Sequence, residues 1–214
     1  MRIMWNEKGD FMAKSNQPYR YLITDSIVNG NFDYELSQEE YYQLYSFYVT
    51  YSLCENQSHR RRTFSDYGWQ TEKIQLKNHS ATDLGKVLKS CMNLSDSNFI
   101  FNEKDSLKIL FKQNHLEDGI LSENNTERCV IGKTNAGNRY LKVFYRIRNC
   151  LAHGKFLLKY SSTNERMIVF QDDNRNNVTA RMIFKLSTLI NIVYSVDKNN
   201  IIIPKRENVE KDVA

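Results

Sequence analysis

The sequence predicts a mainly α-helical fold. Proline and glycine are scarce, at two and eight of 214 residues, which disfavours a loop-rich β-sandwich and favours long helices. Apolar residues recur at intervals of three and four along several runs, as they do on one face of a helix. Only late in the chain does this period give way to β-like runs, which predict one hairpin. We therefore expect a helical bundle with a small β-hairpin between its last two helices.

The length of the chain suits a single domain, residues 1–214. We expect its core at about 38–196, with an N-terminal extension at 1–37 and a charged tail at 204–214. A hydrophobic fraction of 41% with 12% aromatic residues is typical of a globular chain. The net charge of +5 permits a polyanionic partner such as RNA.

The four cysteines, at positions 54, 91, 129 and 150, show no C-x2-C spacing, and the four histidines do not complete a zinc pattern. We expect reduced thiols, no metal site and no cofactor. No early apolar run resembles a signal peptide, and no stretch of about 18 apolar residues occurs. These observations favour a cytoplasmic protein that does not enter a membrane.

The first well-defined helix is expected at about 38–55. Ser37 and Glu40 form a capping box, in which each side chain satisfies a backbone N–H group of the other residue. Tyrosines follow at helical spacing, among them Tyr41 and Tyr45. One interpretation is a surface on which nucleic-acid bases stack. The favoured one is a packed core helix whose hydroxyl groups lie at the rim.

A basic and aromatic segment follows this helix. Arg60, Arg61 and Arg62 precede three aromatic residues, Phe64, Tyr67 and Trp69. Basic residues interleaved with aromatic ones suit single-stranded nucleic acid. An equally weighted alternative is a solvated loop whose aromatic rings pack back onto the core.

The remaining elements follow from periodicity and from capping residues. We expect a short helix from Pro18 to about Val28, a short strand within 71–79, helices at 80–92 and from 105 to before 118, a connector at 95–102, an asparagine-rich loop at 122–138, a helix at 137–152, a hairpin of 155–160 and 166–170 joined by 161–165, and a final helix at 178–196.

Candidate catalytic residues cluster at the end of the expected helix 137–152. Arg148, Asn149 and His153 stand there, followed by Gly154. A histidine suits proton transfer near neutral pH, and a guanidinium offers forked donors to phosphate oxygens. The pair could therefore promote attack of an RNA 2′-hydroxyl on the adjacent phosphate without a metal. The acid and the base would be one histidine from each of two copies, or one histidine and a water.

The spacing of Arg148 and His153 sets a geometric condition. Five residues turn an ideal helix by about 500°, so the two side chains point roughly 140° apart. Either His153 lies past the last regular turn, where Gly154 lets the chain swing round, or the two converge only with a second subunit. Asn149 could orient the phosphate or His153, or merely cap the helix. Arg146 also stands within reach in the sequence, and Lys155 could add a contact to RNA.

The run Arg148 to His153 resembles the Arg-x4-His motif of HEPN domains, whose second position is often a polar residue such as Asn. The resemblance implies a small helical bundle that dimerises so that two Arg/His pairs line one cleft. It also implies an endoribonuclease of toxin–antitoxin, abortive-infection or antiviral systems, with RNA as substrate and an antitoxin or regulatory protein as partner. Arg148 would contact the scissile phosphate. His153 would act as an acid or a base or would bind the phosphate, and Asn149 would support both residues.

One position departs from a branch of that family. Members that pair with a nucleotidyltransferase antitoxin carry a modified Tyr two residues after the His, and this chain has Lys155 there. Two alternatives to the nuclease stay open. One is a non-catalytic module that holds RNA or a nucleotide, and the other is a helical interaction protein in which the motif stabilises a dimer.

Overall fold

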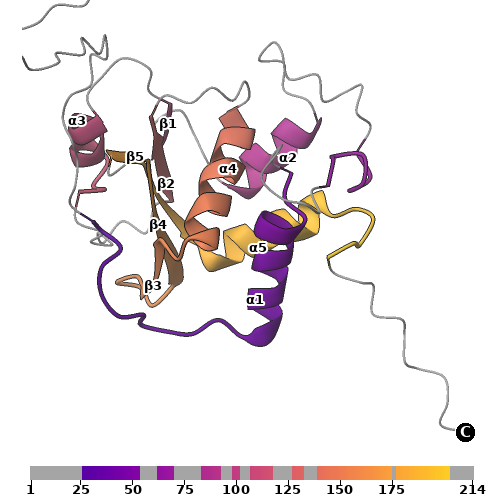
Figure 1. Ribbon diagram of the computed structural model, residues 1–214, viewed down its shortest axis with the longest axis horizontal. Helices are drawn as coiled ribbons and strands as arrows, with labels where there is room; N and C mark the ends of the chain where they lie inside the picture. Colours follow the sequence, from indigo (N-terminus) through magenta and orange to yellow (C-terminus); the bar gives the residue numbers. More distant parts are fainter. Residues whose placement is uncertain are drawn as a thin grey trace, which may run out of the picture.

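The computed structural model describes residues 26–53, 62–69, 83–92, 98–101, 107–117, 127–132, 139–174 and 177–202. Within these ranges helices and strands alternate along the chain (Figure 1). In chain order they are α1 (Gln38–Leu44), the π-helix η1 (Tyr45–Thr50), α2 (Asp83–Cys91), β1 (Phe99–Phe101), α3 (Leu107–Gln113), β2 (Arg128–Ile131), α4 (Arg139–Ala152), β3 (Phe156–Tyr160), β4 (Arg166–Asn174), β5 (Asn177–Lys185) and α5 (Leu186–Val196).

The strands form one five-stranded mixed sheet in the order β1-β2-β5-β4-β3. Strands β3, β4 and β5 are antiparallel neighbours joined by short connections. β2 joins the other edge of β5 antiparallel, and β1 lies parallel to β2. A parallel pair needs a crossover connection, and here α3 lies between β1 and β2 in the chain.

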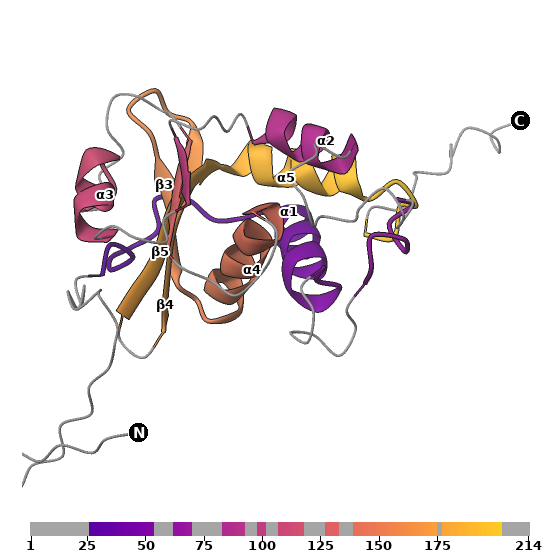
Figure 2. The same ribbon diagram turned by 90° about the horizontal axis from the view of Figure 1, so that it is seen from above.

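Helices cover both faces of this sheet. Figure 2 shows the sheet nearly edge-on, with α1, α2, α4 and α5 on one side and α3 on the other. Alternate residues of β4 point to opposite faces. Ile168 and Phe170 enter the core beneath α4 and α5, whereas Met167 and Val169 enter a second core beneath α3.

The prediction of a mainly α-helical bundle is wrong. The hairpin of β3 and β4 is correct as a hairpin, but it belongs to a five-stranded sheet rather than decorating a bundle. The largest single error is the helix expected at 178–196, because residues 177–185 form β5 and only Leu186–Val196 is helical. β5 is buried on both faces, so its apolar residues do not alternate with polar ones, and periodicity cannot distinguish such a run from a buried helix.

Two further strands lie where connections were expected. β1 falls in the predicted connector 95–102, and β2 falls in the predicted loop 122–138. Both are short, and all four residues of β2 are buried. They exist because β5 offers an edge to β2, and β2 in turn offers an edge to β1. Strands of three or four residues that form through pairing with distant parts of the chain have almost no recognisable local sequence pattern.

Most of the expected helices are confirmed within the described residues. α1 and η1 occupy the predicted helix after Ser37, and the capping box forms, with Glu40 N–H donating to Ser37 Oγ at 3.2 Å and Ser37 N–H to Glu40 Oε2 at 2.9 Å. α2, α3 and α4 lie within or overlap their predicted ranges. Residues 26–30, at the end of the helix expected from Pro18, are not helical, and the rest of that helix and residues 71–79 lie outside the described ranges.

The segment 26–37 packs along β3 and β4 before α1 begins. Ile27 and Tyr34 are buried, and the Tyr34 hydroxyl donates to the carbonyl of Met167 at 2.9 Å. Asp33 N–H donates to the carbonyl of Leu158 at 2.8 Å. This segment therefore brings the chain past the free edge of β3 to the side of the sheet on which α4 ends.

Candidate functional site

α4 ends in a Schellman turn that presents the candidate residues. The N–H of Lys155 donates to the carbonyl of Cys150 at 2.8 Å, and the N–H of Gly154 donates to that of Leu151 at 3.4 Å. Gly154 has φ of +65°, a left-handed conformation that glycine adopts without cost. A Cβ atom at this position would meet nothing within 4 Å, so conformation rather than space calls for glycine. The chain thus changes direction at Gly154, after His153.

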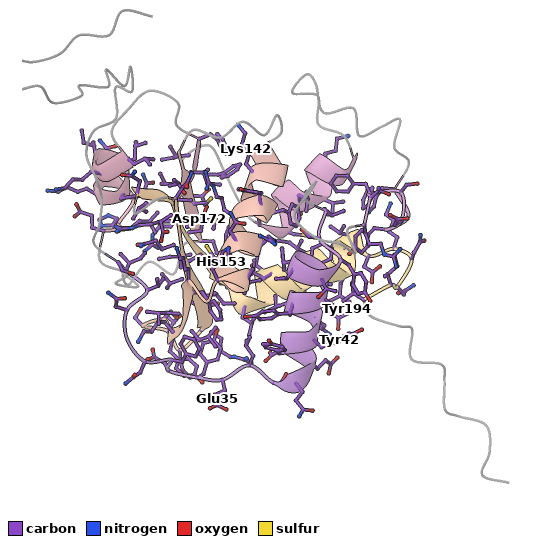
Figure 3. The ribbon with its side chains drawn as sticks, in the orientation of Figure 1. Glu35, Tyr42, Lys142, His153, Asp172 and Tyr194 are labelled. Atoms are coloured by element: carbon purple, nitrogen blue, oxygen red, sulfur yellow. The ribbon has the colours of Figure 1, made fainter. Side chains whose placement is uncertain are left out.

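His153 nevertheless stays in the register of the helix. Its N–H donates to the carbonyl of Asn149 at 3.0 Å, the i to i−4 bond of an α-helix. The chain therefore turns only after His153, and the side chains of Arg148 and His153 keep their separation of roughly 140° around the axis. The imidazole is exposed, and Figure 3 shows it at the lower end of α4, between the sheet and α1.

Asn149 positions Arg148. The Arg148 Nη1 group donates to Asn149 Oδ1 at 3.1 Å, and both side chains are partly exposed. This contact is none of the roles that the sequence left open for Asn149, because its amide oxygen accepts from Arg148 and not from His153 or a backbone N–H group. Since the guanidinium is permanently charged, this end of α4 carries a held positive charge at the surface.

Arg146 is occupied elsewhere. Its guanidinium is buried, forms an ion pair with Asp172 of β4 and donates to Thr179 Oγ1 of β5 at 2.8 Å. It therefore fastens α4 to the sheet and is not available to a phosphate in solvent. Between the two arginines that the sequence offered, the geometry favours Arg148.

The remaining candidate RNA contacts are dispersed. Lys155, half-buried, pairs with Asp173. Arg62 is exposed, and its guanidinium lies 5.4 Å from the centre of the Tyr51 ring. Arg60 and Arg61 lie outside the described residues. Figures 1 and 2 place residues 62–69 near the C-terminal end of α5, away from the end of α4.

The aromatic rings of that segment pack back onto the protein. Tyr67 and Trp69 are buried, and the Trp69 indole N–H donates to the carbonyl of Val196 at 2.8 Å. The alternative of a solvated loop with inward rings therefore describes residues 62–69 better than a stacking surface does.

Some tyrosines of the predicted helix 38–55 lie in the core, and others are exposed as a stacking surface would require. Tyr48 lies in the core, where its hydroxyl donates to the carbonyl of Leu189 at 3.2 Å, whereas Tyr41 and Tyr42 are half-exposed. Tyr45 donates its hydroxyl to the carbonyl of Leu151 at 3.2 Å, and its ring stacks on that of Tyr41. The spacing of four residues could have suggested this pair, but nothing in the sequence placed it beside the end of α4.

The described cysteines serve the core. Cys91, Cys129 and Cys150 are free thiols in the described part of the chain. Burial raises the pKa of the Cys129 and Cys150 thiols well above its ordinary value, which makes them poor nucleophiles. Within the described ranges, no three His, Cys, Asp or Glu side chains gather in a way that could hold a metal ion. No helix among them has the length and hydropathy that crossing a membrane requires.

The structure defines an α/β protein in which Arg148 lies near the end of α4 and His153 directly follows that helix. Comparison with protein-family models, with curated proteins and with solved structures found no match.

Proposed function

We propose that the protein is an endoribonuclease that cuts RNA without a metal, at a site completed by a second copy of the chain. The observation that carries this proposal is the exposed end of α4, where Asn149 holds the guanidinium of Arg148 and a Schellman turn follows the exposed His153. The resemblance of these residues to the HEPN motif supports the same chemistry, although the bundle that it implied does not form.

The proposed reaction is a transesterification within the RNA strand. His153 accepts the proton of a 2′-hydroxyl, whose oxygen forms a bond to the adjacent phosphorus. The bond from phosphorus to the 5′-oxygen breaks, and a water protonates that leaving oxygen. Arg148 binds the phosphate oxygens as negative charge builds on them. The products are a 2′,3′-cyclic phosphate and a 5′-hydroxyl.

The helical register favours a site made by two copies. Within one chain Arg148 and His153 diverge by roughly 140° around α4. A symmetric pair of chains can bring Arg148 of one copy and His153 of its partner to the same phosphate. Two such sites form in each dimer, one for each arginine.

The biological setting belongs to the same proposal. An enzyme that cuts cellular RNA would act in the cytoplasm, as a toxin or as an effector of phage defence. Its activity would require restraint by an antitoxin or another regulatory protein. This part rests on the resemblance of the motif alone.

The divergence of the two side chains also supports a second candidate. A single copy can hold a phosphate through Arg148 without presenting His153 to the same atom. Such a protein would bind RNA or a nucleotide and would not cut it. Binding without cleavage by the wild type would favour this alternative.

The test compares the wild type with Arg148→Ala and His153→Ala. Each is incubated in EDTA with end-labelled single-stranded and structured RNA, and the fragments are resolved. Matched controls are Arg62→Ala, an exposed arginine in the segment 62–69 away from the end of α4, and His115→Asn, which replaces an exposed histidine with φ of +51° by a residue that tolerates this conformation. We expect discrete cuts ending in 2′,3′-cyclic phosphate from the wild type and both controls, and none from the two site variants. Equal cutting by all five proteins would overturn the assignment.

A further inference from the structure

Two half-exposed aromatic rings flank the end of α4. Tyr41 of α1 is 52% exposed and Phe32, in the segment before α1, is 50% exposed. Single apolar side chains at a surface are ordinary. These two differ because each stacks on a second ring, and that second ring belongs to or contacts the chain within three residues of His153.

Tyr41 is fixed to α4 through Tyr45. The two rings stack with centroids 4.2 Å apart and an interplanar angle of 22°. The Tyr45 hydroxyl donates to the carbonyl of Leu151 at 3.2 Å, two residues before His153. One face of the Tyr41 ring is thus supported by Tyr45, while half of the side chain remains exposed to solvent.

Phe32 is supported by a ring of the sheet. Its ring stacks on Phe156 with centroids 5.5 Å apart and an interplanar angle of 23°. Phe156 is the first residue of β3, two residues after Gly154, and packs in the core on the α4 side of the sheet. The bond from Asp33 N–H to the carbonyl of Leu158 holds the segment that carries Phe32 against β3.

The acidic residue next to each ring in the sequence is paired with a cation. Asp33 forms an ion pair with Lys159 at 2.9 Å, and Glu40 forms one with Arg166 at 2.7 Å. Their charge therefore opposes an incoming phosphate less than a lone carboxylate would. α4 contributes the Arg148 cation, three residues before the Leu151 carbonyl that Tyr45 contacts. Aromatic rings beside positive charge are the combination that binds single-stranded nucleic acid.

We infer that Tyr41 and Phe32 are stacking platforms for two unpaired bases of a single-stranded RNA, one on either side of the phosphate that Arg148 holds. The inference rests on the proposed function and names its substrate class. Bases in a duplex already stack on their neighbours, whereas bases of a single strand can splay onto protein rings. The enzyme therefore selects single-stranded or looped RNA through these rings and not through Arg148, which contacts only the backbone.

Tyr42 provides a matched control. It is the same residue type, on the same helix and 53% exposed, but one helical step turns it about 100° from Tyr41. Figure 3 shows Tyr42 and Tyr194 together on the side of α1 and α5, away from His153. Tyr41→Phe keeps the ring and removes only the hydroxyl, so it separates a contribution of the ring from one of the hydroxyl group.

The experiment measures the Kd of a fluorescein-labelled, single-stranded 2′-O-methyl RNA, which cannot be cleaved, and in parallel the kcat and KM for the cleavable RNA of the same sequence. We expect Tyr41→Ala and Phe32→Ala each to weaken binding by roughly tenfold and to raise KM with kcat unchanged. Tyr42→Ala retains wild-type values, and Tyr41→Phe, which keeps the ring, recovers the binding that Tyr41→Ala loses. A duplex of the same sequence binds all variants equally.

Each other outcome has a definite meaning. If Tyr41→Ala binds the RNA as tightly as Tyr42→Ala does, the platform is overturned while cleavage can stand. If Tyr41→Ala keeps RNA binding but loses self-association in sedimentation, the ring belongs to a protein interface and the platform is again overturned. Binding that depends on Tyr41 without any cutting by the wild type supports the platform and overturns only the nuclease. A wild type that binds no RNA overturns both.

Discussion

Two arginines that stand two residues apart on α4 have different surroundings. Arg146 is buried against Asp172 and Thr179 of the sheet, whereas Arg148 is partly exposed and held by Asn149. Two residues turn a helix by about 200°, so the two guanidinium groups leave it on opposite sides. A spacing rule read from the sequence cannot separate them, but the position of the sheet does.

This difference predicts opposite effects of two similar substitutions. Arg146→Ala leaves Asp172 buried without its cation and should cost about 3–5 kcal/mol of unfolding free energy. Arg148→Ala changes a partly exposed side chain and should stay within about 0.5 kcal/mol of the wild type while abolishing RNA cleavage. Urea denaturation monitored by circular dichroism measures both. Equal loss of stability in the two variants would contradict the separate roles assigned to them.

At the scale of the element, the end of α4 depends on one backbone conformation. Gly154 is left-handed at φ of +65°, and the Schellman bonds of Lys155 and Gly154 to the last turn need that conformation. The turn also places β3 to start at Phe156, directly after the helix. The geometry of the helix end and the start of β3 therefore both depend on Gly154.

Gly154→Ala should lower the unfolding free energy by about 1–2 kcal/mol, the cost of holding an L-residue in this region. The space around Gly154 is open, so steric overlap adds nothing to this cost. Gly154→Asn should lose less, because asparagine tolerates the left-handed conformation better than alanine does. Chemical denaturation of the two variants tests this order. A larger loss in the Asn variant would mean that space, not conformation, selects glycine.

The start of α1 is tied to the hairpin through Glu40. This carboxylate accepts from Ser37 N–H and from both terminal nitrogens of Arg166, at 2.9 and 2.7 Å. Burial alone would raise the pKa of Glu40, but the hydrogen bonds from Arg166 and Ser37 outweigh it and hold the pKa below its usual value of 4.5. The contact thus joins a helix terminus to a strand through a charge that depends on pH.

A lowered folded pKa sets the direction of the pH effect. The unfolded chain binds a proton at Glu40 more readily than the folded chain does, so this contribution to stability is present above about pH 4.5 and is lost as the pH falls through the folded pKa. Glu40→Gln lacks it. We expect the stability gap between wild type and Glu40→Gln to shrink as the pH falls below about 4.5 in urea titrations. A gap that widens on acidification would contradict the assigned sign.

At the scale of the whole molecule, the sheet separates two cores and leaves the end of α4 at the surface. The larger core lies under α4 and α5, and the smaller one lies under α3. The end of α4 stands between α1 and the start of β3 and remains open to solvent at His153. A second copy of the chain, or an RNA strand, can therefore reach it without unfolding any element.

The proposed dimer predicts complementation between two inactive variants. When Arg148→Ala and His153→Ala are mixed and allowed to exchange subunits, each mixed dimer holds one site with an intact arginine and an intact histidine. Activity should return to about a quarter of that of the wild type, because random exchange puts half of the dimers in mixed form with one of two sites intact. Either variant incubated alone is the control. Mixtures that stay inactive despite proven exchange would exclude the arrangement between copies.

How far the sequence predicted the molecule differs from element to element. Ser37 and Glu40 predicted the start of α1, and Gly154 predicted the end of α4. The two apolar runs predicted the hairpin of β3 and β4. These features act over a few neighbouring residues, so a single sequence contains them. The stacked pair of Tyr41 and Tyr45 was visible as spacing, but its position beside Leu151 depends on residues more than a hundred positions away.

The sequence by itself determined the capping box of α1, the end of α4 before Gly154 and the positions of Arg148, Asn149 and His153 along that helix end, because each depends on local backbone chemistry. Tertiary structure alone decided that residues 177–185 are a strand, since a run buried on both faces has no period of its own. It also decided that Arg146 belongs to the core and Arg148 to the surface, because only the folded sheet brings Asp172 against one side of α4. The strand conformation of residues 177–185 and the burial of Arg146 are stabilised by contacts between distant residues, and a local sequence pattern contains no information about such contacts.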